Sequence, residues 1–181
     1  MTVLDRASAP LFPTIPTDSA LNPRALAAVT RAFARRLLAG DLGPVHYGDP
    51  DRPGERWHVR VHADALVDVW VISWLPEQGT RLHDHGGSSG AFTVVQGSLT
   101  EAAWSPATAG RGRLVDHVHA TGRTVAFGPE RVHDVRNLHA APALSVHAYS
   151  TPLLRMGFYD LLDGALHQTS VLDTSDPEAT Q

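Results

Sequence analysis

The chain contains no cysteine, which excludes disulfides, thiolate metal ligands and a cysteine nucleophile. It has no excess of positive charge either, since its net charge is -4 at pH 7, and so no electrostatic reason to bind nucleic acid or an anionic membrane. No apolar run approaches the ~20 residues that span a bilayer. Residues 1–20 also lack the charged start and apolar core of a secretion signal. These absences predict a cytoplasmic protein with no nucleic-acid or membrane partner.

Histidine, in contrast, is abundant, with 11 residues among 181. Because thiols are absent, a transition-metal site in this chain would use imidazole and oxygen ligands. The length suits one domain with a sizeable core. We expect that domain over residues 21–173, between an extended, proline-rich lead-in at 1–20 and a polar, frayed tail at 174–181.

The domain is expected to begin with a short helical segment and to continue as an all-β structure. Asn22 as N-cap, Pro23 in the first turn and apolar residues at helical spacing predict a helix over 22–39. From about residue 54 to 173, short β-type runs alternate with turns that contain glycine or proline, a pattern typical of a sandwich or barrel. Residues 161–164 are interpreted as a turn. The expected strands cover residues 56–62, 67–74, 91–96, 98–104, 114–118, 124–127, 132–136, 143–149 and 166–172.

Two histidines one residue apart, His83 and His85, lie in the glycine-flanked stretch 79–90. On a strand, side chains alternate between faces, so both imidazoles would point the same way, roughly 7 Å apart. A lone histidine is usually a core or surface residue, but an in-phase pair beside glycine-rich turns favours two ligands of one metal ion. His133, in a later β-type run, is the candidate for the third ligand.

A second His-x-His pair, His117 and His119, also falls on an expected strand. It lacks the glycine-rich flanks of the first pair, and its continuation offers no third ligand at a suitable spacing. We interpret it as an exposed pair or a pair at the rim of the barrel.

The first pair resembles the first motif of the cupins, in which His-x-His is followed by a glutamate and then by a glycine that closes a turn. Gly97 matches the closing glycine, but Gly90 stands at the glutamate position. His133 with Asn137 matches the second cupin motif. The resemblance implies a single-domain jelly-roll β-barrel with three neutral imidazoles and no carboxylate around its metal. A substrate that brings an anionic donor, such as a thiolate, would replace the missing charge.

Within the cupins, the chain is similar to the thiol dioxygenases, most of all to cysteine dioxygenases of the bacterial type, over roughly residues 57–152. This resemblance implies an iron(II) enzyme that adds both atoms of O2 to the sulfur of L-cysteine and forms cysteine sulfinate. The matching residues are Arg60, Trp74, the first histidine pair, the run 96–101, His133 and the run 145–150.

The resemblance also implies roles for individual side chains. Ser145, His147 and Tyr149 would form a hydrogen-bonded relay that places the Tyr149 hydroxyl beside the iron, and as alternate residues of one strand they share a face. The alternative is that His147 and Tyr149 are inward-facing core residues. Arg60 would hold the substrate carboxylate through two parallel hydrogen bonds, unless Arg56 takes that place or Arg60 faces solvent.

Two departures from the family pattern concern the pocket. Animal cysteine dioxygenases carry a cysteine that crosslinks to the active-site tyrosine, and Gly90 stands in its place, so no such crosslink can form. The family also commonly has Ser-Pro-Pro after the tyrosine, with a cis peptide in the pocket wall, whereas this chain has Ser150, Thr151 and Pro152. A cis bond without proline costs about 2.5–4 kcal/mol, so we expect a different wall.

The sequence therefore predicts a monomeric iron(II) thiol dioxygenase with L-cysteine and O2 as its small-molecule partners. Three alternatives stay open. One is the same chemistry on 3-mercaptopropionate or another small thiol, and another is a non-catalytic cupin that binds a metal. The last is a different cupin oxidation or isomerisation with another metal, since three imidazoles accept several transition-metal ions.

Overall fold

The computed structural model describes residues 20–49, 51, 54–107 and 111–177. Within them one helix, α1 (Pro23–Leu38), precedes ten strands. The expected lead-in at 1–19 and the end of the expected tail at 178–181 lie outside the described residues. The strands are β1 (His58–Ala63), β2 (Asp68–Trp74), β3 (Ser89–Gln96), β4 (Ser98–Pro106), β5 (Gly112–Ala120), β6 (Thr124–Phe127), β7 (His133–Arg136), β8 (Ala143–Ser150), β9 (Arg155–Leu162) and β10 (Ala165–Asp173).

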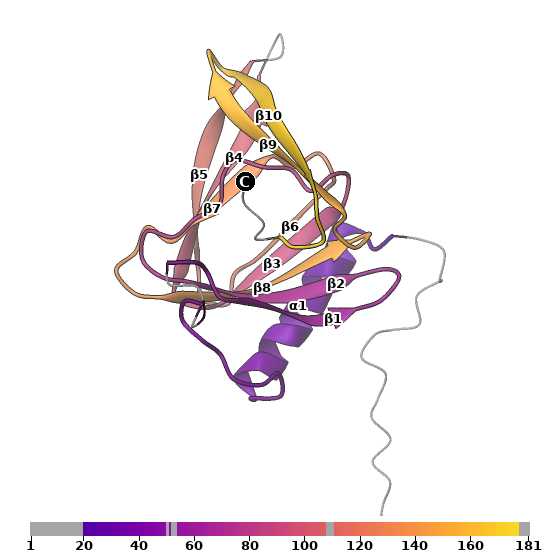
Figure 1. Ribbon diagram of the computed structural model, residues 1–181, viewed down its shortest axis with the longest axis vertical. Helices are drawn as coiled ribbons and strands as arrows, with labels where there is room; N and C mark the ends of the chain where they lie inside the picture. The colour runs from indigo at the N-terminus through magenta and orange to yellow at the C-terminus, as the bar shows by residue number, and fades with distance from the viewer. Residues whose placement is uncertain (1–19, 50, 52–53, 108–110, 178–181) are drawn as a thin grey trace, which may run out of the picture.

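The strands form three sheets around a common interior (Figure 1). The largest sheet has the order β1-β2-β8-β3-β6, and each pair of neighbours in it is antiparallel. In Figure 1 the three-stranded sheet β5-β4-β7 and the β9–β10 hairpin lie above this five-stranded sheet, whereas α1 lies below it. The interior of the barrel is therefore bounded by sheets, and the helix covers one sheet from outside.

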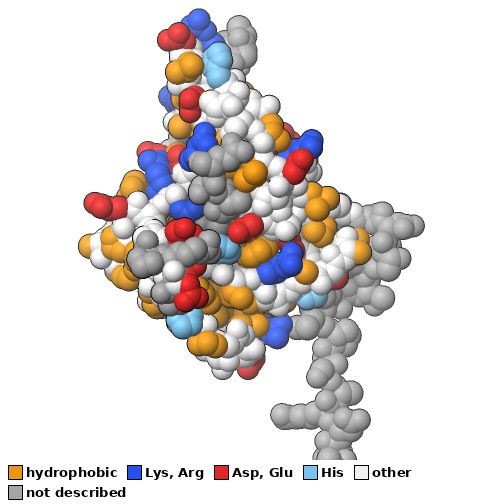
Figure 2. Space-filling model, in the orientation of Figure 1, with side chains coloured by type: hydrophobic (Ala, Val, Ile, Leu, Met, Phe, Trp, Pro, Cys, Tyr) orange, Lys and Arg blue, Asp and Glu red, His pale blue; other side chains and the backbone are white. Residues whose placement is uncertain are grey.

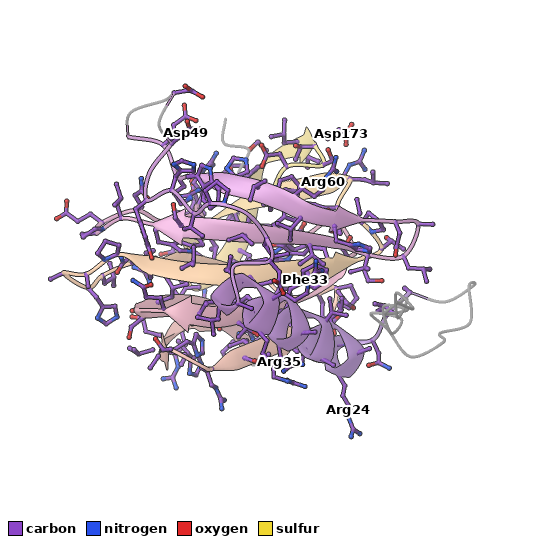
Figure 3. The ribbon with its side chains drawn as sticks, turned by 90° about the horizontal axis from the view of Figure 1, so that it is seen from below. Arg24, Phe33, Arg35, Asp49, Arg60 and Asp173 are labelled. Carbon is purple, nitrogen blue, oxygen red and sulfur yellow. The ribbon has the colours of Figure 1, made fainter. Side chains whose placement is uncertain are left out.

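Helix α1 begins as the sequence predicts. Asn22 caps the first turn by accepting a hydrogen bond from the Ala25 N–H at 3.0 Å, and Pro23 occupies the first helical position. Seen from below, α1 runs across the strands (Figure 3). Its apolar stripe packs on the outer face of the five-stranded sheet in a cluster that includes Leu26, Val29, Phe33, Leu37, Val69, Val71, Val146 and Ala148.

Strand β8 separates this outer cluster from the interior. Val146 and Ala148 pack against α1, whereas Tyr149 belongs to a second cluster inside the barrel, because successive side chains of a strand point to opposite faces. The second cluster is rich in aromatic rings and includes Trp70, Trp74, Phe92, Phe127 and Phe158. Together the sheets and the helix form the all-β cupin jelly-roll with a short N-terminal helical segment that the sequence predicts.

Strand β9 is absent from the strands that the sequence predicts, because Gly157 interrupts its pattern. The glycine is needed for a close approach: a Cβ at this position would lie 2.8 Å from Asp84 Oδ2, and the Gly157 N–H donates to Asp84 Oδ1 at 3.1 Å. The expected turn at 161–164 is shorter, since only Asp163 and Gly164, both with positive φ, separate β9 from β10. β9 thus docks on the loop that carries the first histidine pair.

No helix in the part of the chain that the structure describes is long and apolar enough to cross a membrane. On the face drawn in Figure 2, arginine side chains and acidic side chains are interspersed. This mixed face fits the small net charge of -4.

Candidate metal centre

His83 and His85 lie in the loop between β2 and β3, and not on the strand from which their common direction was predicted. Two isolated antiparallel bridges join the loop to β7, Gly79 to Arg136 and His83 to His133, and the second lies at the start of the strand. The His83 N–H donates to the His133 carbonyl at 2.9 Å, and the His133 N–H donates to the His83 carbonyl at 3.0 Å. The second bridge sets two histidines from distant parts of the sequence side by side.

The three imidazoles converge on one point in the interior. The ring centroids of His83 and His85 are 4.9 Å apart, and the ring of His133 is 5.0 Å from the first and 5.1 Å from the second. One ring nitrogen of each lies within 4.8 Å of the others. All three side chains are buried. The structure therefore brings together the three residues that the sequence predicts as ligands.

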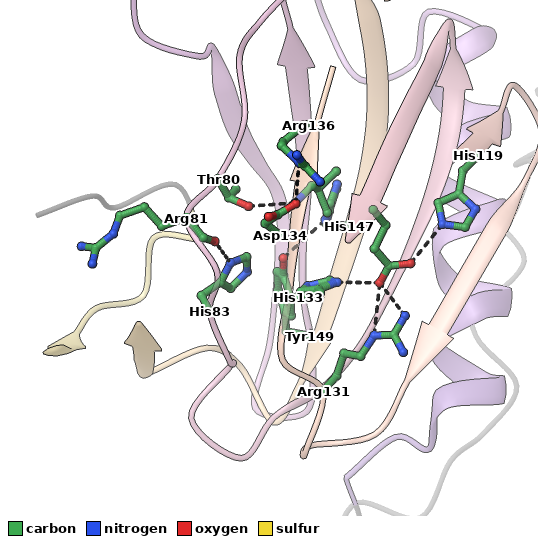
Figure 4. A network of polar contacts seen from close by, with 12 residues as sticks. Thr80, Arg81, His83, His119, Arg131, His133, Asp134, Arg136, His147 and Tyr149 are labelled. Atoms are coloured by element: carbon green, nitrogen blue, oxygen red, sulfur yellow. Dashed lines mark hydrogen bonds and ion pairs between the residues drawn. The ribbon is translucent and has the colours of Figure 1, made fainter. Parts of the chain in front are cut away.

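The hydrogen bonds of the three rings fit a metal ion between them. The Nδ1–H of His83 donates to the Arg81 carbonyl at 2.7 Å, and the Nδ1–H of His133 donates to Glu101 Oε1 at 2.7 Å, which leaves each Nε2 with its lone pair (Figure 4). Both nitrogens of His85 are buried without a hydrogen-bond partner among the described residues. A buried imidazole in this state is expected of a metal ligand, because a metal bond replaces the missing hydrogen bond.

Burial keeps the imidazoles of His83 and His85 neutral. Desolvation, with a contribution from the neighbouring His133, lowers the pKa of His83 to about 3. Desolvation and the adjacent histidines also hold the pKa of His85 well below its usual value. A neutral imidazole offers a lone pair, so no proton competes with a metal ion at neutral pH.

Glu101 is a buried carboxylate beside the histidine cluster for which the sequence predicts no role. It lies on β4 with 1% of its surface exposed, and its carboxylate accepts hydrogen bonds from three side chains. Arg131 donates to Oε1 from Nε at 3.1 Å and from Nη2 at 2.7 Å, alongside His133, while the Nε2–H of His119 donates to Oε2 at 3.0 Å. Burial alone would raise the pKa of Glu101, but the hydrogen bonds from His119, His133 and Arg131 hold it well below its usual value. A buried anion therefore stands directly behind His133, one of the three clustered imidazoles.

The second His-x-His pair divides between surface and interior, so its interpretation as an exposed or rim pair is wrong for one member. His117 is exposed, whereas His119 is buried with 7% of its surface exposed. The buried member is the residue that reaches Glu101. In the strand register Glu101 lies opposite His117 and Leu99 lies opposite His119, so no local signal in the sequence singles out His119 as the partner of Glu101.

Ser145, His147 and Tyr149 share the inner face of β8 and are connected in a row. The Nε1–H of Trp74 donates to Ser145 Oγ at 2.8 Å, Ser145 Oγ lies 2.9 Å from His147 Nε2, and His147 Nδ1 lies 3.4 Å from the Tyr149 hydroxyl. The Tyr149 ring stacks on His85 with a centroid distance of 5.0 Å. Desolvation lowers the pKa of His147 to about 3, so this imidazole is neutral. The row ends beside the three-histidine cluster.

The space beside Gly90 explains why neither a cupin glutamate nor a crosslinking cysteine stands there. A Cβ at Gly90 would lie 2.4 Å from Cε2 of Phe127 and 3.2 Å from Cδ1 of Tyr149. The Phe127 ring fills this place and stacks on His85 at 5.0 Å. An apolar ring therefore occupies the side of the site where the cupin pattern has a carboxylate.

Two arginines border the interior near the first strand. Arg60 is exposed, and its guanidinium stands over the Trp70 ring with Cζ 5.4 Å from the ring centroid. Arg56 is half-buried, stands over the Trp74 ring at 5.1 Å and donates a hydrogen bond to the Gly79 carbonyl. The charge of Arg56 also contributes to the lowered pKa values of two interior histidines. Both arginines thus lie against tryptophans that face the interior.

The peptide bond between Ser150 and Thr151 is cis. The expectation that this part of the pocket wall differs from the family, because the first proline is missing, is therefore wrong at this bond. Ser150 is buried, and its Oγ accepts a hydrogen bond from the Leu21 N–H at 2.7 Å. The hydroxyl ties the segment before α1 to the end of β8.

The fold and the histidine cluster define a cupin with a three-histidine site that can hold a metal ion. The chain matches the family model described as cysteine dioxygenase type I over residues 47–161, which is more than half of its length. It belongs to the cysteine dioxygenase type I family. A search of curated proteins finds no match.

Solved structures of low sequence identity resemble the chain. The TT1209 protein of Thermus thermophilus is 20% identical, with a TM-score of 0.49, over 62% of this chain and 92% of that one. An oxalate oxidase in complex with glycolate is 16% identical, with a TM-score of 0.48, over 57% of this chain and 55% of that one. An uncharacterised Klebsiella pneumoniae protein with a double-stranded β-helix domain is 20% identical, with a TM-score of 0.47, over 57% of this chain and 78% of that one.

Proposed function

We propose that the protein is an iron(II)-dependent dioxygenase that converts L-cysteine and O2 to cysteine sulfinate. Both oxygen atoms become bonded to sulfur, the sulfur gives up four electrons, O2 accepts four, and the thiol proton is released with the sulfinate. No external reductant is needed. The observation that carries the proposal is the three-histidine cluster with the Ser145–His147–Tyr149 row beside it, in a chain of the cysteine dioxygenase type I family.

His83, His85 and His133 would hold the iron through three imidazole nitrogens. The chemistry that iron(II) supplies when bound is acidification of a coordinated thiol and one-electron exchange with O2. The ligand set carries no charge of its own, so it favours a substrate that brings an anionic sulfur. The aromatic rings of Phe127 and Tyr149, which stack on His85, limit the access of water to this side.

Tyr149 would act as the hydrogen-bond donor to the reacting atoms. The Trp74 indole can only donate a hydrogen bond, so Ser145 Oγ accepts its N–H. The Ser145 hydroxyl can then donate its own hydrogen bond to Nε2 of His147. The neutral His147 then carries its proton on Nδ1 and donates to the Tyr149 oxygen. In this chain of hydrogen bonds each group donates one hydrogen to the next, and the last bond orients the phenol of Tyr149 toward the three histidines.

Arg60 would bind the substrate carboxylate. It lies opposite Trp70 on the neighbouring strand, and Trp70 lies opposite His147. Two strand spacings separate Arg60 from His147, about 10 Å between backbones, a distance that the long arginine side chain and an amino-acid substrate together can span. A guanidinium that holds a carboxylate through two parallel hydrogen bonds suits an amino acid.

Replacing Arg60 with Gln tests this role. A charge-assisted hydrogen bond contributes about 1.5–3 kcal/mol, so we expect Arg60→Gln to lower kcat/KM for cysteine by about 10- to 100-fold. The preference for cysteine over 3-mercaptopropionate should fall as well. The measurement is O2 uptake by the iron-loaded protein with each thiol over a range of concentrations.

Arg56→Gln is the matched control, because Arg56 also stands over a tryptophan at the same side of the barrel. An unchanged preference in Arg60→Gln would refute the role of Arg60. If Arg56→Gln alone loses the preference, the carboxylate site belongs to Arg56.

We also propose that the enzyme is a monomer in the cytoplasm and that its only partners are the thiol and O2. The same site on 3-mercaptopropionate is the second candidate, and it is favoured if that thiol has the higher kcat/KM. A non-catalytic metal cupin would bind iron but consume no O2 with any small thiol.

A further inference from the structure

The second His-x-His pair is the sequence motif that the proposed function leaves unused. Its two members differ in surroundings although they are two residues apart on β5. His119 is 7% exposed and donates from Nε2 to Glu101 Oε2 at 3.0 Å, whereas His117 is exposed, with its ring 6.3 Å from that of His119. The pair thus offers one residue in a buried network and one natural control beside it.

The network connects β5 to the metal centre through one carboxylate. β4 lies between β5 and β7 in the three-stranded sheet, so Glu101 on β4 can contact both neighbours. Its Oε2 is held by His119 from β5, and its Oε1 by His133 from β7 (Figure 4). Arg131 adds two hydrogen bonds to Oε1 from the loop before β7.

The residues of this network differ in how far their side chains are exposed to solvent. Glu101 and His133 have side-chain exposures of 1% and 3%, whereas Arg131 has 28%. Arg131 is therefore partly solvated and its charge is screened, whereas the Glu101 carboxylate and the His133 ring are in direct contact and almost fully buried. A carboxylate that accepts the second ring N–H of a ligating histidine fixes the tautomer and the ring orientation and makes the imidazole a stronger donor.

We propose that His119 and Arg131 are positioning residues of the metal centre: they hold the Glu101 carboxylate against His133, and through that bond Glu101 strengthens and orients one of the three ligands. The negative charge that the ligands lack is thereby supplied one hydrogen bond behind them. This inference rests on the part of the proposed function in which the three histidines bind a metal ion. It does not depend on thiol oxidation.

The test is the affinity of the full-length protein for Fe(II) and for Co(II), measured anaerobically in competition with a chelator. We expect Glu101→Gln to weaken binding by about 10- to 100-fold, because Gln cannot accept the His133 and Arg131 hydrogen bonds together as an anion. His119→Ala should weaken it by a smaller factor, and His119→Gln, whose amide can donate to Oε2, should restore part of the loss. His117→Ala should bind as wild type does.

A second readout separates positioning from a purely structural role. The absorption bands of bound Co(II) should shift in Glu101→Gln and in His119→Ala, and the Fe(III)/Fe(II) potential should rise, since the ligand loses its anionic partner. If Glu101→Gln does not fold, His119→Ala and Arg131→Gln carry the same test. Metal affinity and spectra equal to wild type in these variants, or equal losses in His117→Ala and His119→Ala, would overturn the inference.

The outcome is distinguishable from a failure of the proposed function. Metal binding that depends on Glu101 in a protein that oxidises no thiol supports this inference and refutes the dioxygenase. Thiol oxidation by the wild-type protein, together with unaltered metal binding in Glu101→Gln, supports the dioxygenase and refutes this inference.

Discussion

His85→Phe is expected to abolish metal binding and activity while the fold keeps its stability. The His85 ring makes no hydrogen bond within the described residues and stacks between Phe127 and Tyr149, with both centroid distances at 5.0 Å. Phenylalanine keeps the stacked ring but has no lone pair, so metal affinity should fall by more than the ~10- to 100-fold that the loss of an outer partner costs. Because no hydrogen bond is broken, the unfolding free energy of the metal-free protein should change by less than about 1 kcal/mol or rise.

Metal content after anaerobic loading and urea unfolding of the metal-free protein measure the two effects separately. His62→Ala is the control, since His62 pairs with Asp64 away from the three histidines. Stoichiometric iron in His85→Phe would remove this residue from the ligand set. A loss of several kcal/mol of stability with full metal binding would assign His85 to the core.

Tyr149→Phe is expected to lower kcat by about 10²- to 10⁴-fold, the usual contribution of a positioned proton donor. Iron content should remain at the wild-type level, because the ring that stacks on His85 is kept. His147→Gln should cause a smaller fall, since it disturbs only the orientation of the phenol. The measurement is single-substrate kinetics at saturating O2, with metal content determined on the same samples.

Tyr47→Phe is the control for loss of a tyrosine hydroxyl, as Tyr47 donates to Gln96 at the surface. A wild-type kcat in Tyr149→Phe would mean that the Ser145–His147–Tyr149 row only packs in the core and has no role in the reaction. The alternative from the sequence, in which these residues merely face inward, would then be correct.

The helix and most strands can be predicted from the sequence, because they depend on local patterns of residues. Asn22 and Pro23 mark the start of α1 because capping depends only on the first turn. The alternation in β8 predicts that Ser145, His147 and Tyr149 share one face of the strand, and the structure shows that this face is the inner one. Strand β9 could not be predicted in this way, because Gly157 is required by its close approach to Asp84, a residue far away in the sequence.

The sequence predicts the three clustered histidines and the Ser145–His147–Tyr149 row, but not the hydrogen-bond network behind His133. The spacing of His83 and His85 predicts a ligand pair, although the two residues lie in a loop that is held by bridges to β7 and β9 and not on a strand. Glu101 and His119 had no local signal, because their roles arise from the pairing of three strands. A missing charge in the ligand set is visible in the sequence, whereas a carboxylate behind a ligand is visible only in the structure.

Whether the protein is a cysteine dioxygenase is tested most directly by O2 uptake of the iron-loaded protein on addition of L-cysteine, with isotopically labelled O2 and analysis of the product. We expect one O2 to be consumed per cysteine and both labelled atoms to be found in cysteine sulfinate, with no uptake in His85→Phe. No uptake with cysteine, or uptake that yields the disulfide without label in the sulfur product, would contradict it.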